Sequence, residues 1–117
     1  MRVIQVIADL TVDDIEAAKE FYAGYLNLAD EEMNLGWVAR FTSPDTGAFL
    51  QLVTHDASAP ENPVISVRVD DVEAAYEDAQ ARGYEIVHPL VTEEWGVRRF
   101  FVRAPDGNVL NILQHHD

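Results

Sequence analysis

A seven-residue segment occurs twice in this chain, and the repeat limits what the chain can fold into. Residues 12–18 read VDDIEAA and residues 69–75 read VDDVEAA, a separation of 57 positions (69 − 12). At 117 residues the chain is long enough for one domain of ordinary size but too short for two. Two copies are also too few for a solenoid. The repeat therefore predicts a pseudo-symmetric pair of half-modules that share one domain.

Each copy of the repeat follows a segment in which apolar residues alternate with others, in residues 2–12 and 64–69. A period of two is typical of a strand with one buried face. Each strand then meets Asp-Asp followed by Glu, which predicts a helix N-cap with acid in the first turn. We expect helices over about residues 14–25 and about 71–82, the second ended by Gly83.

The apolar face of each strand should pack under its helix, leaving the opposite face to line a cup. On the first strand, the residues expected under the helix are Ile4, Val6, Ala8, Leu10 and Val12. The first helix should bury Ile15, Ala18, Phe21, Tyr22 and Tyr25, and the second Val72, Ala75, Tyr76 and Ala79.

The correspondence continues beyond the helices. ARFTSPDTGAFLQLV (39–53) resembles FFVRAPDGNVLNILQ (100–114), and in both a strand enters a Pro-Asp turn and leaves as another alternating strand. This is the pattern of a β-hairpin. Each half therefore reads strand–helix–strand–strand–strand. We predict a single α+β domain over residues 1–117, with half-modules 1–53 and 64–117, linker 54–63, and a curved mixed sheet.

The βαβββ repeat, VDDIEAAKEFYAGYLNL and the ending VRRFFVRAPDGNVLNILQ resemble the vicinal oxygen chelate superfamily, which includes glyoxalases, extradiol dioxygenases and bleomycin-resistance proteins. WGVRRFFVRAPDGN is most similar to the bleomycin-resistance and glyoxalase-like branch. The resemblance implies a glyoxalase-like fold, a homodimer, and a cup with a divalent metal at its floor. It places the four metal-ligand positions at Ile7, Gln51, Val64 and Asn111.

Two of those four side chains are hydrocarbons and two are neutral amides. A site for a divalent ion needs several carboxylate, imidazole or thiolate ligands. We therefore predict no metal and no cofactor. Asp9 lies two residues beyond Ile7 on the same face, so a register slip would bring one carboxylate to the floor. The chain has no cysteine. Its histidines, His55, His88, His115 and His116, fall outside the mapped face and are expected at the surface or at strand edges, so no catalytic residue is assigned.

Without a metal, the cup would be a concave, largely apolar site with a few orienting polar groups. The tryptophans, which precede the third strand of each half, would either stack on a ligand or pack a loop. Alternation places Arg40 and Arg68 on the cup face, and Arg99 is a further candidate there. These arginines would either pair with Asp9, Glu93 and Glu94 or, unpaired, favour an anionic ligand group. The candidate ligand-binding residues are Ile7, Asp9, Trp37, Arg40, Phe49, Gln51, Val64, Arg68, Trp95, Arg99, Phe101 and Asn111.

The composition of the chain limits the classes of partner that it can be expected to bind. With 21 acids against eight bases, the net charge of −13 opposes nucleic-acid binding and would attract cations. No apolar run suits a membrane helix, and a cytoplasmic location is expected. The leading hypothesis is a protein that sequesters a small organic ligand, cationic or aromatic, in a metal-free cup. The alternatives are a metal-dependent lyase, isomerase or dioxygenase with an unconventional site, and a structural or regulatory partner domain.

Overall fold

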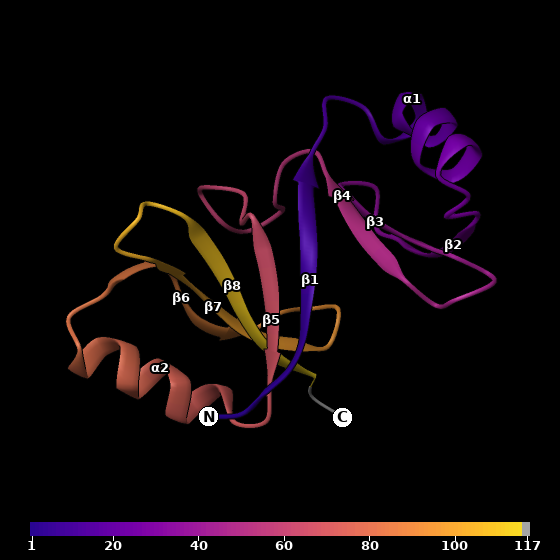
Figure 1. Ribbon diagram of the computed structural model, residues 1–117. Coiled ribbons are helices and arrows are strands. Elements are labelled where there is room, and N and C mark those ends of the chain that lie inside the picture. The colour runs from indigo at the N-terminus through magenta and orange to yellow at the C-terminus, as the bar shows by residue number, and fades with distance from the viewer. Residues whose placement is uncertain (116–117) are drawn as a thin grey trace. The chain divides into compact units, whose positions relative to one another are not determined.

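The computed structural model describes residues 1–115 and divides into two compact units (Figure 1). The N-unit comprises Ile7–Ser58, and the C-unit comprises Met1–Val6 together with the chain from Ala59 onward. Both halves have the predicted strand–helix–strand–strand–strand order, so the predicted α+β fold is confirmed. The elements are β1 (Val3–Thr11), α1 (Ile15–Lys19), η1 (Glu20–Tyr25), β2 (Asp30–Asn34), β3 (Val38–Thr42), β4 (Phe49–Val53), β5 (Ile65–Val69), α2 (Val72–Ala81), β6 (Glu85–Thr92), β7 (Val97–Arg103) and β8 (Val109–His115).

The N-unit is a mixed sheet with strand order β2-β3-β4-β1. Strand β4 runs antiparallel to β3 and parallel to the end of β1, and β3 runs antiparallel to β2. One face of this sheet packs under the helix, where Ala39, Phe41 and Leu52 are almost fully buried against Ile15. The alternating pattern of residues 39–53 therefore predicted which side chains share the core face.

The first helix differs from the prediction of one α-helix. It changes after Lys19 into a π-helix, in which Leu26 N donates to Phe21 O at 2.9 Å. A π-helical turn holds more residues than an α-helical turn, so side chains that α-helical spacing would align move to different faces. The predicted burial of Phe21 and Tyr25 is wrong: they are 53% and 76% exposed.

The C-unit contains the second sheet, with strand order β5-β8-β7-β6. Strand β8 runs parallel to β5 and antiparallel to β7, and β7 pairs antiparallel with β6. Helix α2 covers one face, burying Val72, Ala75 and Ala79 against Phe100 and other strand residues, as predicted.

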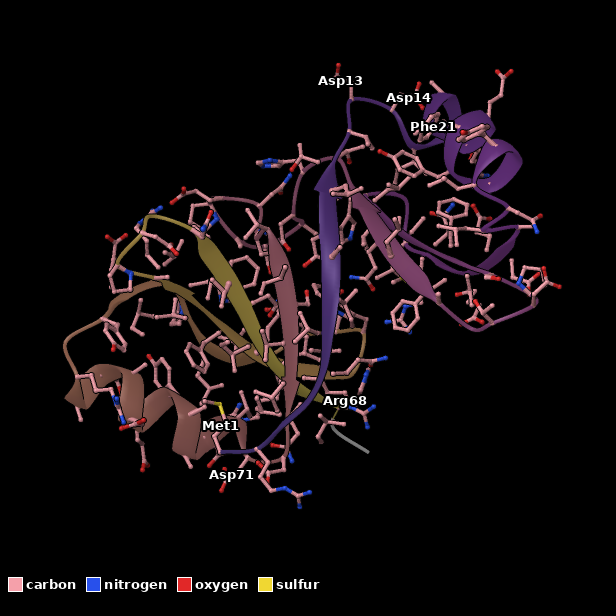
Figure 2. All side chains as sticks on the ribbon, viewed as in Figure 1. Met1, Asp13, Asp14, Phe21, Arg68 and Asp71 are labelled. Atoms are coloured by element: carbon pink, nitrogen blue, oxygen red, sulfur yellow. The ribbon has the colours of Figure 1, made fainter. Side chains whose placement is uncertain are left out.

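Both helices begin as the repeated Asp-Asp pair predicts. Asp14 and Asp71 lie in the turns that lead into α1 and α2 (Figure 2), and each carboxylate accepts a backbone N–H from three residues later. Helix α2 ends with Gly83 at φ +75°, and Tyr84 N bonds back to Ala79 O, which closes the final turn.

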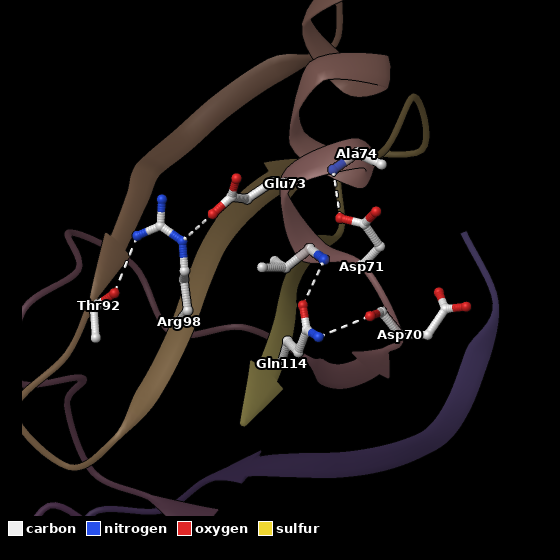
Figure 3. Close-up of polar contacts among 8 residues, drawn as sticks. Asp70, Asp71, Glu73, Ala74, Thr92, Arg98 and Gln114 are labelled. Atoms are coloured by element: carbon white, nitrogen blue, oxygen red, sulfur yellow. Dashed lines mark hydrogen bonds and ion pairs between the residues drawn. The ribbon is translucent and has the colours of Figure 1, made fainter. Parts of the chain in front are cut away.

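Gln114, at the end of β8, fixes the start of α2 to the sheet (Figure 3). Its Oε1 accepts from Val72 N at 3.0 Å, and its Nε2 donates to Asp70 O at 2.7 Å. Arg98 lies nearby, between Glu73 and Thr92. One amide thus satisfies a helix donor and a loop carbonyl that would otherwise need water.

Strand β1 contradicts part of the burial prediction. Leu10 and Val12 pack against the helical core, but Ile4, Val6 and Ala8 are exposed. Alternation predicts which residues share a face, but it does not supply an element to cover that face. Among residues 1–115, no helix has the length and apolar character needed to cross a lipid bilayer.

Candidate functional site

The N-unit sheet face opposite the helix carries a row of three polar side chains. The strand register places Asp9 of β1 opposite Gln51 of β4, and Gln51 opposite Arg40 of β3. Gln51 Nε2 donates to Asp9 Oδ1 at 2.8 Å, and Arg40 Nη2 donates to Gln51 Oε1 at 3.1 Å. The structure therefore brings together three of the predicted site residues on one sheet.

The orientation of the Gln51 amide follows from its neighbours. An arginine only donates, so the amide oxygen must face Arg40, and an ionised carboxylate only accepts, so the amide nitrogen must face Asp9. Gln51 and Asp9 are buried, whereas Arg40 is half-buried. The amide is thus held between a cation and an anion.

Phe49 and Thr42 form the next position along the same face, where they are register partners. The guanidinium carbon of Arg40 lies 4.6 Å from the centroid of the half-buried Phe49 ring. Thr42 was not predicted as a site residue, and its Oγ1 is buried without a hydrogen-bond partner. Its position two residues beyond Arg40 on an alternating strand was the signal that could have identified it.

The C-unit sheet has an equivalent row with different chemistry. Ser66 of β5 lies opposite Asn111 of β8, which lies opposite Phe101 of β7. Asn111 Nδ2 donates to Ser66 Oγ at 3.0 Å, while Asn111 Oδ1 is buried without a partner. Ala59, from the linker, packs against Phe101, which is fully buried. On this unit, the chain's own linker covers the aromatic surface that was expected to line a ligand site.

A second polar cluster surrounds Arg99 in the C-unit. Its guanidinium carbon lies 5.0 Å from the Trp95 ring and 4.7 Å from the Phe101 ring, and Nη2 lies 3.7 Å from Glu93 Oε2. Of the two alternatives left open for Arg99, the structure shows the pairing with Glu93. Both side chains are deeply buried, so the pair forms part of the interior of the unit.

His88 corrects the prediction that the histidines lie at the surface or at edges. Its ring is buried, its Nδ1 lies 2.7 Å from Pro89 O, and its Nε2 lies 3.6 Å from Glu93 Oε1. Because a carbonyl only accepts, Nδ1 carries a proton. His55 and His115 are exposed, as expected, and His116 lies outside the described residues.

The remaining predicted residues are dispersed. Ile7 is buried, but Val64 is 45% exposed and precedes β5, so it does not form the buried floor predicted for it. Arg68 lies opposite Leu113, on the same face as Ser66, as its alternation predicted. Trp37 is half-buried immediately before β3, and its carbonyl accepts from Thr54 N at 2.9 Å.

The residues at the family's ligand positions do not fit a divalent metal. Ile7 and Val64 offer no donor atom, and the oxygen of Gln51 already accepts from a guanidinium cation that would repel a metal ion. Within residues 1–115, no three His, Asp or Glu side chains are grouped as a metal site requires.

A groove of about 300 Å³ also exists in the C-unit. It lies between α2 and the strands, lined by Ala79, Phe100, Ile112 and neighbouring residues. This is the helix-covered side of the sheet, so the groove is separate from the Ser66–Asn111 row.

Comparisons with known proteins agree on the fold. Residues 3–112 match the model of the Glyoxalase/Bleomycin resistance protein/Dioxygenase superfamily. A search of curated protein sequences found no match.

Three solved structures illustrate the likeness. An NAD-dependent benzaldehyde dehydrogenase from Legionella pneumophila is 20% identical, with a TM-score of 0.75 over 95% of this chain and 99% of that one. A superfamily member from Vibrio splendidus is 19% identical, with a TM-score of 0.71 over 97% and 99%. Methylmalonyl-CoA epimerase from Mycobacterium tuberculosis is 20% identical, with a TM-score of 0.71 over 98% and 90%.

At such identities, the likeness to these structures shows a shared fold. It gives no information about the ligand of this chain. The family match covers nearly the whole chain, and both halves have the βαβββ order that the repeat predicted. The chain belongs to the glyoxalase/bleomycin resistance protein/dioxygenase superfamily.

Proposed function

We propose that this protein binds a small organic molecule without a metal ion, on the face that carries Asp9, Gln51 and Arg40. The observation that supports this most is the Gln51 amide, held by hydrogen bonds to Arg40 and Asp9. A preorganised polar row beside a half-buried aromatic ring suits the recognition of an organic ligand. The chelation of a metal would instead require the amide oxygen to leave its cationic partner.

The net charge of the protein and the local charge at the proposed site favour ligands of opposite sign. The overall charge of −13 favours cationic ligands at long range, whereas Arg40 supplies a local positive charge. Aromatic ligands of either sign have a ring to stack on in Phe49, which is half-buried.

A thermal-shift panel tests the proposal. It should contain matched aromatic carboxylates, neutral amides and ammonium compounds, each measured from micromolar to millimolar concentration. A ligand at 100 times its Kd adds about 2.7 kcal/mol to the free energy of unfolding, which corresponds to a rise in Tm of about 5 °C or more. If no member of the three classes raises the Tm, the binding proposal is contradicted.

An enzyme is the second candidate, and the buried contact between His88 and Glu93 favours it. An imidazole beside a carboxylate is a common general base. The fold likeness to methylmalonyl-CoA epimerase suggests one assay. Deuterium incorporation from D₂O into methylmalonyl-CoA, lost in the His88→Gln variant, would favour catalysis over simple binding.

The homodimer also remains a proposal. Val3, Ile4 and Val6 of β1 are each more than half exposed, which is unusual for large apolar side chains on one strand. Light scattering across a concentration series should give twice the monomer mass. A monomer mass at all concentrations would contradict the dimer.

A further inference from the structure

Among residues 1–115, no acidic side chain neutralises the half-buried guanidinium of Arg40. Its hydrogen bond goes to the neutral amide of Gln51, and its Nε is buried without an acceptor. Among residues 1–115, no carboxylate oxygen lies within 4.0 Å of its guanidinium nitrogens. Removing a charge from water without a partner is costly, so the site is electrostatically incomplete.

The guanidinium is nevertheless fixed in place. Phe49 supports it from one side, at 4.6 Å between guanidinium carbon and ring centroid. Gln51 holds Nη2 at 3.1 Å, and Asp9 in turn fixes the Gln51 amide. A planar donor held on an aromatic ring is preorganised for a planar acceptor such as a carboxylate.

A second group on the same face also has unused hydrogen-bonding capacity. Thr42 Oγ1 is buried without a partner, and Thr42 is the register partner of Phe49. A hydroxyl can donate as well as accept. The Phe49 ring is therefore flanked on one sheet face by two polar groups with unused hydrogen bonds.

Arg99 provides the contrast within the same chain. It also lies against aromatic rings, but Glu93 lies 3.7 Å from its Nη2, and its side chain is only 3% exposed. Within the described part of the chain, one ring-stacked arginine thus has a carboxylate partner, and the other, more accessible one has none.

We infer that the ligand of this protein carries a carboxylate, which binds Arg40, and an apolar or aromatic part that packs on Phe49. The inference rests on the proposed binding function and names its ligand class. The acidic surface does not prevent it, because repulsion between exposed charges is screened beyond about 8 Å at physiological salt. The contact itself would be a charge-assisted hydrogen bond in a partly dry site.

The test compares three probes that differ only in the polar group: benzoate, benzamide and benzylammonium. Binding is measured by calorimetry and by NMR of the arginine Nε–H signals. The probe concentration is raised to about 20 mM, at which a probe with a Kd of about 1 mM would occupy most of the sites. Benzoate should bind at least about tenfold more tightly than benzamide and shift the Arg40 Nε–H signal.

Two variants and one control assign the contact. Arg40→Gln removes the cation and should weaken benzoate binding at least about tenfold. The double variant Asp9→Asn/Gln51→Glu keeps the size and shape of both side chains but moves the carboxylate of the row next to Arg40. Because this carboxylate would then pair with Arg40, benzoate binding should weaken to a similar degree. Arg98→Gln removes the same charge from a surface ion pair with Glu73 and should leave binding unchanged.

Each other result overturns the inference. Arg40 is not a carboxylate site if benzoate does not bind or binds no better than benzamide. The same holds if benzoate binds equally well to the wild type, to Arg40→Gln and to Asp9→Asn/Gln51→Glu. Tighter binding of benzylammonium or benzamide would reject the ligand class while supporting an organic-ligand function. A Tm raised only by aromatic compounds that lack a carboxylate would also reject the ligand class and support an organic-ligand function.

Discussion

The two halves of this protein have the same backbone plan but different chemistry on equivalent sheet faces. In the N-unit, Asp9, Gln51 and Arg40 form a row of ion and amide contacts. In the C-unit, the corresponding positions hold Ser66, Asn111 and Phe101.

Accessibility differs in the same way. Arg40 and Phe49 are half-buried, whereas Phe101 is fully buried under Ala59. The repeat thus retains the helix-facing core, while one opposite face is left partly accessible and the other is filled by the linker. Pseudo-symmetry therefore predicts where a site can lie, but not which half carries it.

The largest expected effect tests whether the two cores are equivalent. Phe41 and Phe100 are each about 1% exposed on the helix-facing side of their sheets. Phe41→Ala and Phe100→Ala should each lower the free energy of unfolding by about 3–5 kcal/mol, measured in urea. Phe49→Ala, on the half-buried opposite face, is the control and should cost clearly less. A loss below about 1 kcal/mol in either core variant would show that the two cores are not equivalent.

The next effect compares the two polar rows. Asp9→Ala leaves the buried Gln51 amide nitrogen without its anionic partner and should cost about 1–3 kcal/mol. Ser66→Ala removes a neutral hydrogen bond from Asn111 and should cost about 1 kcal/mol. Both are measured by chemical denaturation. Equal losses would show that the charge in the N-unit row adds nothing to its stability.

A smaller effect tests the repeated caps. Asp14 and Asp71 each accept a backbone N–H of their helix, so Asp14→Ala and Asp71→Ala should each cost about 1 kcal/mol. Replacement by Asn keeps an acceptor and is the matched control. If either Ala variant is as stable as its Asn counterpart, the cap in that half contributes nothing.

The smallest effect is the pH dependence of Asp70. The backbone N–H of Arg2 donates to its carboxylate at 2.8 Å and lowers the pKa of Asp70 from its ordinary value of 3.8. A lowered folded-state pKa contributes stability above the unfolded-state value, and this is lost as the pH falls through the folded-state pKa.

Asp70→Asn should therefore be less stable than wild type at neutral pH, with the difference shrinking below pH 3.8. Asp13, its equivalent in the first repeat, points away from the helix in Figure 2 and serves as the control. A stability difference that is the same at neutral and acidic pH would contradict the assignment.

Much of the fold could be predicted from the sequence, because period-two alternation and capping are local. The strands around Gln51 and Asn111 are regular, so their faces and partners followed from counting. Strand β6 is different: its register shifts on both sides of His88, and counting through such bulges assigns residues to the wrong face.

The other differences between prediction and structure have separate causes. EFYAGY carries no signal that distinguishes a π-helix from an α-helix, so the exposure of Phe21 was not predictable. Among residues 1–115, no acid pairs with Arg40. This depends on tertiary placement, since Asp9, the acid of the row, bonds to Gln51 instead. The sequence could identify Arg40 as a candidate site residue but not its state of pairing.

The proposed metal-free site is tested by a calorimetric titration of chelator-treated protein with Zn²⁺, Ni²⁺, Mn²⁺ and anaerobic Fe²⁺. A His115→Ala/His116→Ala variant, run in parallel, removes adventitious binding to the C-terminal histidines. We expect no stoichiometric binding to the variant, because Gln51 is committed to Arg40 and the other family positions supply no anionic donor. Tight binding of one metal per chain to this variant would contradict the metal-free site and favour an enzyme in which Asp9 is a ligand.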